Sequence, residues 1–287
     1  MSAAFARVVA SPPAAADVPP KKVPRHPIEH VLKRAAPWVP RAVLSAGLAA
    51  ALGDLKLTLC FHRVGVEAKQ WTMPPAELDR MLELLTGSRP PGASRWLTLA
   101  FDDGYADAVD YVASRARRHP DVEWLVFVCP AKAEHRLGYQ WDAGSPCELA
   151  SVEALRALQR VPNVELGNHT SSHLVQMLLD DTQAAEEYES STADFRRLFG
   201  VSPRHFAFPF GTPQLEFEQR HVELLRRISP GTQLWSTERR PYDAAERVPG
   251  AVLPRFSVDS TWSSRQVVLW VSAHAVKYRL KGTPHHF

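Results

Sequence analysis

Seven short apolar runs of the β type alternate with helical patterns along this chain, and that alternation constrains the fold more than any other feature. The runs cover residues 55–62, 95–102, 122–129, 164–169, 204–210, 232–237 and 251–258. Helical patterns lie near residues 75–86, 105–119, 151–160, 172–199, 215–228 and 264–280. Strands that alternate with helices usually pair in parallel. The sequence therefore predicts an α/β fold, a seven-stranded (β/α) barrel. Seven strands rather than eight are expected to leave it distorted or partly open.

The expected barrel takes up residues 28–280 as a single domain, because no repeat or long linker interrupts the alternation. Residues 1–27, rich in alanine and proline, are expected to form a disordered tail, and residues 281–287 a second tail. The apolar stretch at 42–53 is far shorter than the ~20 residues that cross a bilayer, so a packed helix and no transmembrane span is expected there. The N-terminal residues do not resemble a secretory signal, which predicts a cytoplasmic location.

The net charge and the cysteines indicate whether nucleic-acid binding or disulfide bonds are to be expected. The chain has 34 basic and 31 acidic residues, a net charge of +3, which is too weak a field to indicate nucleic-acid binding. Its three cysteines, Cys60, Cys129 and Cys147, have no C-x-x-C spacing, and an odd count argues against a disulfide framework. We expect them to be reduced. Nothing in the sequence indicates an oligomeric state.

Polar side chains gather at the ends of the predicted strands. Asp102 and Asp103 end one strand, and His169 and His173 follow another, four residues apart at the expected start of a helix. Imidazoles at that spacing share one helical face and can reach one cation. Each feature alone has an ordinary structural explanation, a helix cap for the acids and a surface pair for the histidines. Together they supply the three protein ligands of an open metal site.

Three motifs in this order resemble the polysaccharide deacetylase family, which is carbohydrate esterase family four and carries the chitooligosaccharide-deacetylase homology domain. They are "FDDG" at 101–104, "HTSSH" at 169–173 and "FAFPFG" at 206–211, within a resemblance that covers roughly residues 55–258. The resemblance implies that Asp102 is the catalytic base. It also implies that Asp103, His169 and His173 bind a divalent metal. Zn²⁺ suits such a set best, and Co²⁺, Ni²⁺ or Fe²⁺ are also compatible with it.

The sequence departs from the common family pattern at two places. Many members have an arginine where this chain has Ala207, and "LPR" at 253–255 makes Arg255 the candidate replacement. The usual C-terminal Leu-His motif is absent, and His274 lies in a helical pattern instead. The "HRV" that begins at His62 resembles a circularly rearranged branch whose first strand supplies this histidine. This resemblance implies that His62 is the general acid, and it is physically reasonable because the first and last strands of a closed barrel are neighbours.

The resemblance implies hydrolysis of an N-acetyl group on an amino sugar, an oligosaccharide or a glycan conjugate. Asp102 would take a proton from water, and His62 would give one to the departing amine. A backbone N–H near Tyr105 is expected to stabilise the oxyanion. Trp141 and Phe210 are candidates to bind the sugar ring. Two alternatives stay open, an esterase that removes O-acetyl groups with the same metal site and a carbohydrate-binding barrel without catalysis.

Overall fold

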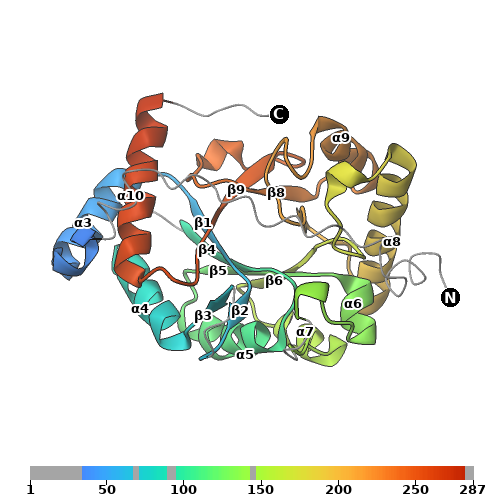
Figure 1. Ribbon diagram of the computed structural model, residues 1–287, viewed down its shortest axis with the longest axis horizontal. Helices are drawn as coiled ribbons and strands as arrows, with labels where there is room; N and C mark the ends of the chain where they lie inside the picture. The colour runs from blue at the N-terminus through green and yellow to red at the C-terminus, as the bar shows by residue number, and fades with distance from the viewer. Residues whose placement is uncertain (1–33, 67–70, 89–94, 143–146, 282–287) are drawn as a thin grey trace.

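A parallel barrel of seven strands forms the body of the protein, in the closed order β1-β4-β5-β6-β7-β8-β9 (Figure 1). The computed structural model describes residues 34–66, 71–88, 95–142 and 147–281. The barrel strands are β1 (Leu57–Phe61), β4 (Leu97–Phe101), β5 (Glu123–Val128), β6 (Val164–Asn168), β7 (His205–Ala207), β8 (Gln233–Thr237) and β9 (Val252–Ser257). Each strand falls within a predicted run, so the predicted α/β barrel is confirmed. The predicted tails lie outside the described residues, apart from Lys281.

The barrel is closed, so of the two expected outcomes, a distorted barrel or a partly open one, the second does not occur. β1 pairs with β4 along its whole length and with β9 through Leu59↔Phe256 and Cys60↔Ser257. The seam between β6 and β7 has a single register pair, Asn168↔Phe206. These two short seams complete the closed barrel, so none of its strands is left as a free edge.

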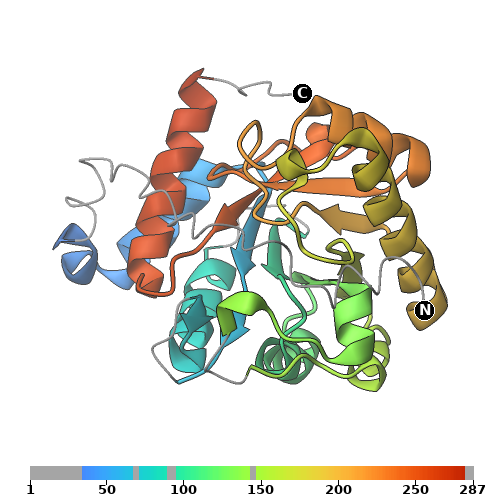
Figure 2. The same ribbon diagram turned by 45° about the vertical axis from the view of Figure 1, so that its right-hand side comes forward.

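Helices surround the barrel on the outside (Figure 2). Their bounds are α3 (Arg41–Leu52), α4 (Pro75–Thr86), α5 (Ala106–Arg115), α6 (Pro130–His135), α7 (Val152–Leu158), α8 (Asp181–Phe199), α9 (Gln219–Ile228) and α10 (Ser264–Lys281). Short 3₁₀ helices cover Ala36–Trp38, Ala116–Arg118, Gln140–Asp142, Gln176–Leu178 and Ala244–Glu246. The helix expected at 42–53 is α3, which packs beside α10 at one flank. Among the described helices, none has the length and apolar character needed to cross a membrane.

The helix predicted over 172–199 begins later, at Asp181. A capping box sets this start, because the Asp180 side chain accepts a hydrogen bond from the Gln183 amide at 2.8 Å and the Gln183 side chain accepts one from the Asp180 amide at 3.2 Å. The residues between β6 and Gln176 are therefore loop. The prediction that His169 and His173 share a helical face is wrong, although the two rings do lie together, with centroids 4.8 Å apart.

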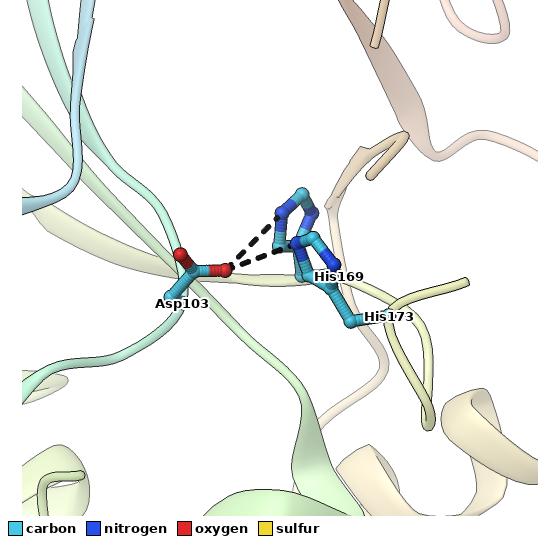
Figure 3. Close-up of side chains that lie close together, drawn as sticks. All are labelled: Asp103, His169 and His173. Atoms are coloured by element: carbon cyan, nitrogen blue, oxygen red, sulfur yellow. Dashed lines mark ion pairs between the residues drawn. The ribbon is translucent and has the colours of Figure 1, made fainter. Parts of the chain in front are cut away.

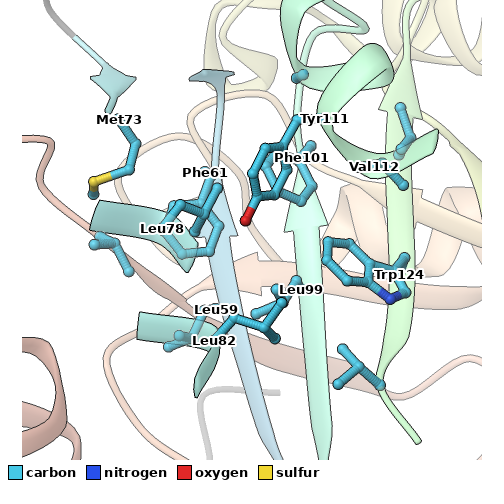
Figure 4. Packing of buried hydrophobic residues seen from close by; sticks show 14 of the residues in the cluster. Leu59, Phe61, Met73, Leu78, Leu82, Leu99, Phe101, Tyr111, Val112 and Trp124 are labelled. Carbon is cyan, nitrogen blue, oxygen red and sulfur yellow. The ribbon is translucent and has the colours of Figure 1, made fainter. Parts of the chain in front are cut away.

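Side chains along the barrel strands point alternately outward, against the helices, and inward, into the barrel. Outward residues of β1, β4 and β5 pack against the helices, as in the stacked rings of Phe101 and Trp124, whose centroids are 6.2 Å apart (Figure 4). Inward residues form a separate apolar cluster that includes Ala100, Leu125 and Phe127. Side chains two apart on a strand point the same way, so Asp102 follows Ala100 toward the barrel interior.

A small parallel ribbon, which the sequence did not indicate, follows the first barrel strand. It consists of β2 (Arg63–Val64) and β3 (Thr72–Met73), paired as Arg63↔Thr72 and Val64↔Met73. Thr72 and Met73 are buried. The ribbon anchors the chain immediately after His62, at the C-terminal end of the barrel.

Candidate active site

Asp102 and Asp103 both enter the site because the chain turns sharply where β4 ends. Asp103 has a φ of +73° and Gly104 a φ of +71°, so both lie in the left-handed region. A Cβ at residue 104 would sit 2.9 Å from Cγ1 of Val128, which explains the glycine. In a regular strand Asp103 would point away from Asp102. The turn cancels that alternation and brings two neighbouring carboxylates to one place.

Asp102 is held on both of its carboxylate oxygens. Arg255 donates to Oδ1 at 2.5 Å, and the Cys60 thiol donates to Oδ2 at 3.4 Å. Burial by itself would raise the pKa of Asp102, but the positive charge of Arg255 reverses this and holds the pKa below its ordinary value. Asp102 is therefore a buried, oriented carboxylate at neutral pH.

Three side chains from two strand ends converge beside Asp102, as Figure 3 shows for Asp103, His169 and His173. Nε2 of His173 lies 3.1 Å from Oδ1 of Asp103, and Nε2 of His169 lies 3.8 Å from the same oxygen. One ligand atom from each of the three lies within 4.8 Å of the others, and all three residues are buried. The predicted metal ligands are thus brought together.

The loop from Thr170 to His173 is not helical, yet it places the His173 ring beside that of His169. Thr170 and His173 have φ values of +67° and +60°, a strained conformation for residues other than glycine. The Thr170 hydroxyl accepts a hydrogen bond from the His173 amide at 3.1 Å. Glu187 on α8 accepts bonds from the amide and hydroxyl of Ser172, at 2.6 and 2.7 Å. Sequence reasoning missed Glu187, because nothing in the pattern of α8 distinguishes it from a surface glutamate.

The donor set of this cluster fits a divalent cation. Nδ1 of His169 lies 2.8 Å from the carbonyl oxygen of Ala207, which fixes the ring and leaves Nε2 facing Asp103. Burial lowers the pKa of His169 to about 4, so the imidazole is neutral at pH 7, as a ligand must be. Oδ1 of Asp103 is buried and has no hydrogen-bond partner among the described residues. A buried carboxylate oxygen in that state is what a cation would satisfy.

His62 lies on the other side of the barrel mouth from His173. It follows β1, which is separated from β6 by β4 and β5 in one direction and by three strands in the other. It lies within electrostatic reach of Asp102 and Asp103, because a positive charge on its ring would lower the pKa of both. The next residue, Arg63, anchors this segment through an ion pair with Asp107 at 2.9 Å.

His274, the other histidine considered for the acid, lies in the outer helix layer on α10. Its ring centroid is 5.3 Å from that of Phe256 and 4.8 Å from that of Trp270. Burial lowers the pKa of His274 to about 4, which is typical of a packed and uncharged histidine. Its surroundings therefore favour His62 as the candidate acid.

Two predicted aromatic residues flank the triad at its surface. Trp141 and Phe210 are 43% and 47% exposed, and the ring centroid of each lies 5.1 Å from that of His173. Trp141 stacks on Tyr139, whose hydroxyl donates to the Asp103 carbonyl at 3.0 Å. Tyr139 was not singled out from the sequence, although it stands two residues before Trp141. The two stacked rings are thus attached to the turn that carries Asp103.

Tyr105, the third residue predicted to contact substrate, is buried rather than facing the mouth. Its hydroxyl donates to Asp142 at 2.8 Å and accepts a bond from the Trp141 indole at 3.1 Å. Burial raises the pKa of Tyr105, so the phenol stays protonated. The Tyr105 side chain thus supports Trp141, and only its backbone amide is left as a candidate oxyanion donor.

Comparison with known families identifies the family to which this part of the chain is related. Residues 89–227 match the model of a family described as polysaccharide deacetylase, and this segment holds Asp102, Asp103 and both histidines of the triad. The matched segment belongs to the polysaccharide deacetylase family. The resemblance carried by the three motifs is confirmed. The circularly rearranged branch stays a prediction, because it rests on the "HRV" at 62–64, outside the matched segment.

Several solved structures share the fold, and some of them are named as deacetylases. The deacetylase PplD of Streptococcus pyogenes, in complex with acetate, is 15% identical with a TM-score of 0.58, over 76% of this chain and 98% of that one. IcaB from Ammonifex degensii is 20% identical with a TM-score of 0.56, over 78% and 98%. A de-N-acetylase from Aggregatibacter actinomycetemcomitans is 12% identical with a TM-score of 0.54, over 76% and 100%. No curated protein matches the chain.

In this polysaccharide deacetylase domain, the residue in place of the common motif arginine is Ala207, and it acts through its backbone carbonyl on His169. The guanidinium that contacts Asp102 belongs to Arg255, on β9. Arg255 is 0% exposed, its Nε donates to the Ser236 carbonyl at 3.3 Å, and it lies 4.9 Å above the Phe127 ring. The candidate replacement therefore lies against Asp102, and its part in catalysis stays a prediction.

We expect Arg255→Met to lower the free energy of unfolding by about 3–5 kcal/mol, because the change leaves Asp102 as an uncompensated buried charge. Adding Asp102→Asn should recover a large part of that loss, since the stranded charge is removed as well. Urea denaturation of the two variants and the parent measures both effects. A loss below about 1 kcal/mol, the range of exposed ion pairs, would contradict a buried pair.

A second cluster of potential ligands lies at the opposite end of the barrel, where Glu123, Glu165 and His205 approach one another. Its charges are already paired. Glu123 binds Arg247 at 2.7 Å, and Glu165 binds Arg204 at 2.7 Å and His205 at 3.0 Å. The cluster is an ion-pair network that closes the N-terminal end of the barrel, and the candidate active site lies at the other end.

Proposed function

We propose that this polysaccharide deacetylase is a metal-dependent hydrolase that removes an N-acetyl group from an amino sugar, an oligosaccharide or a glycan conjugate. The observation that carries the proposal is the triad of Asp103, His169 and His173 directly beside the Arg255-held carboxylate of Asp102. One structural neighbour is named a de-N-acetylase and another was solved with acetate, so the fold is known to carry chemistry of this class.

Two residues on different sides of the site, Asp102 and His62, carry out the two proton transfers. Asp102, oriented by Arg255, accepts the proton of the attacking water. His62, across the mouth, donates a proton to the amine that leaves, because expulsion of an amide anion is prohibitively unfavourable. The backbone amide near Tyr105 is the candidate donor to the oxyanion. A divalent cation held by the triad would polarise the acetyl carbonyl and favour ionisation of water.

Zn²⁺ is the cation that this donor set favours, with one carboxylate and two neutral imidazoles as ligands. Such a set leaves coordination positions open for water and substrate, as a catalytic zinc site requires. Co²⁺, Ni²⁺ and Fe²⁺ also accept imidazole and carboxylate ligands, and affinity alone does not select among these metals. The choice of metal is therefore proposed from the ligand types.

The decisive experiment measures two products from two substrates. The purified protein, supplied with Zn²⁺, is incubated with N-acetylated chitooligosaccharides and with acetylated xylan, and both acetate and free amine are measured. Acetate with an equal amount of free amine supports the proposal. If acetate is released from xylan alone, the protein is an O-acetyl esterase and the proposal is wrong. If neither substrate releases acetate, the non-catalytic carbohydrate-binding barrel is the alternative that is left. Asp102→Asn is the control for contaminating activity.

Metal binding is tested separately from turnover. We expect about one divalent metal per chain and, in His169→Ala, at least about a 10-fold weaker affinity, because even disturbance of groups behind the ligands costs that much. His205→Ala, which removes a histidine from the N-terminal ion-pair network, should keep the full metal content. Elemental analysis and competition with a chelator measure both variants. Full occupancy in His169→Ala would refute the assignment of the triad.

A further inference from the structure

Glu187 on α8 is a buried carboxylate that the proposed reaction does not use. It is 5% exposed, and no ion pair joins it to a cationic side chain of the described residues. A charged side chain is almost never buried in this way without a partner. The partners of Glu187 are two donors of one residue, because its Oε1 accepts from the Ser172 amide at 2.6 Å and from the Ser172 hydroxyl at 2.7 Å. The buried carboxylate therefore holds Ser172.

Ser172 stands immediately before His173, in a loop whose backbone is strained. Thr170 and His173 both have a φ in the left-handed region, and such conformations persist where the surrounding structure enforces them. Within the loop, the Thr170 hydroxyl restrains the His173 amide at 3.1 Å. The bonds from Ser172 to Glu187 add a restraint from outside the loop, at the residue next to the metal ligand.

Three residues of α8 contact this segment from one helical face. Glu187, Ser190 and Ser191 are spaced three and four residues apart, so their side chains point the same way. Oγ of Ser190 lies 3.4 Å from Oγ of Ser171, and Oγ of Ser191 accepts from Nδ2 of Asn168 at 3.0 Å. These two contacts join neutral groups, whereas a hydrogen bond to a carboxylate is roughly twice as strong. Glu187 is therefore the strongest of the three attachments of the loop to α8.

We propose that Glu187 is a positioning residue for the metal, which keeps the His173 ring directed at Asp103 before a cation binds. Nε2 of His173 lies 3.1 Å from Oδ1 of Asp103 in this arrangement. A site whose ligands are already oriented loses less conformational freedom on binding, so its affinity is higher. This inference rests on the proposed metal-dependent function and adds to it a residue that sets the metal affinity.

The experiment measures the affinity for Zn²⁺ of the metal-free full chain by competition with a chelator, a readout that does not depend on turnover. Glu187→Ala should bind Zn²⁺ about 10- to 100-fold more weakly, the usual cost of removing a group that orients a ligand. Glu187→Gln should retain most of the affinity, because its side-chain carbonyl oxygen can accept both bonds from Ser172. Thr192→Val is the matched control. Thr192 is also buried on α8, and its hydroxyl has no hydrogen-bond partner among the described residues, so this variant should bind Zn²⁺ as wild type does.

Ser172→Ala tests the same contact from the loop and serves where Glu187→Ala does not fold. The variant loses the hydroxyl bond and keeps the amide bond, so it should weaken Zn²⁺ binding less than Glu187→Ala does. In the Glu187→Ala background the same change should have no further effect, because the acceptor is already gone. This lack of additivity shows that the effect of Glu187 passes through Ser172.

Wild-type affinity for Zn²⁺ in both Glu187→Ala and Ser172→Ala would overturn the inference. An equal loss in Glu187→Gln and Glu187→Ala would also overturn it, and so would an equal loss in Thr192→Val, which would assign the effect to the packing of α8. If His169→Ala loses the metal while Glu187→Ala binds it as wild type does, this inference fails and the proposed function stands. If the wild-type protein binds no divalent metal, the proposed function itself fails.

Discussion

Asp102→Asn should keep its metal and lose roughly 10²- to 10⁴-fold in turnover, the usual range for a missing general base. Asp103→Asn should lose metal and turnover together. The structure supports different roles for these neighbours, because Asp102 is bonded to Arg255 and Cys60, whereas Asp103 faces His169 and His173. Metal analysis and initial rates on an N-acetylated chitooligosaccharide distinguish the two variants.

A structural effect of Asp102→Asn must be separated from a catalytic one. The change leaves Arg255 as a buried cation without its partner, which by itself destabilises the fold. The double variant Asp102→Asn/Arg255→Met removes the charge and its partner together and is the matched control. It should be well folded, bind metal and remain inactive. Turnover near wild type in this double variant, or identical behaviour of Asp102→Asn and Asp103→Asn, would contradict the division of roles.

His62→Ala should lower amide hydrolysis by roughly 10²- to 10⁴-fold, the range expected for a lost general acid. Its effect on an activated aryl acetate should be much smaller, because that leaving group departs without a proton. His62 is partly buried and the adjoining Arg63 is anchored by Asp107, so the truncation should leave the fold and the metal site in place. Rates on both substrates, together with metal content, measure this contrast.

Replacement of the other candidate histidine is the control for this contrast. His274→Ala removes a ring that packs between Phe256 and Trp270, so it should affect stability and leave the ratio of amide to ester hydrolysis unchanged. If both rates in His62→Ala are those of wild type, His62 is not the acid. An equal fall on both substrates would assign His62 a positioning role.

The fold was largely predictable because period-2 apolar runs and helical patterns are local signals. All seven strands follow from such runs, and the start of α4 at Pro75 follows from a proline at the first helical turn. The predicted start of α8, residue 172, is nine residues too early, because the apolar pattern extends back over the loop that carries His173. The capping box at Asp180 is a local signal that would have corrected it.

The sequence alone identifies the chemical groups of the site: the two carboxylates of "FDDG", the histidine pair and the strands that carry them to one end of a barrel. The approach of Arg255 to Asp102 depends on the tertiary structure, because 153 residues separate them and only closure of the barrel brings β9 beside β1, which in turn pairs with β4. Tertiary structure also decided that the histidine pair meets on a strained loop, which Glu187 holds from α8. The motifs contain the side chains that the chemistry needs. The position of each group depends on contacts between segments far apart in the chain, and no local pattern encodes those contacts.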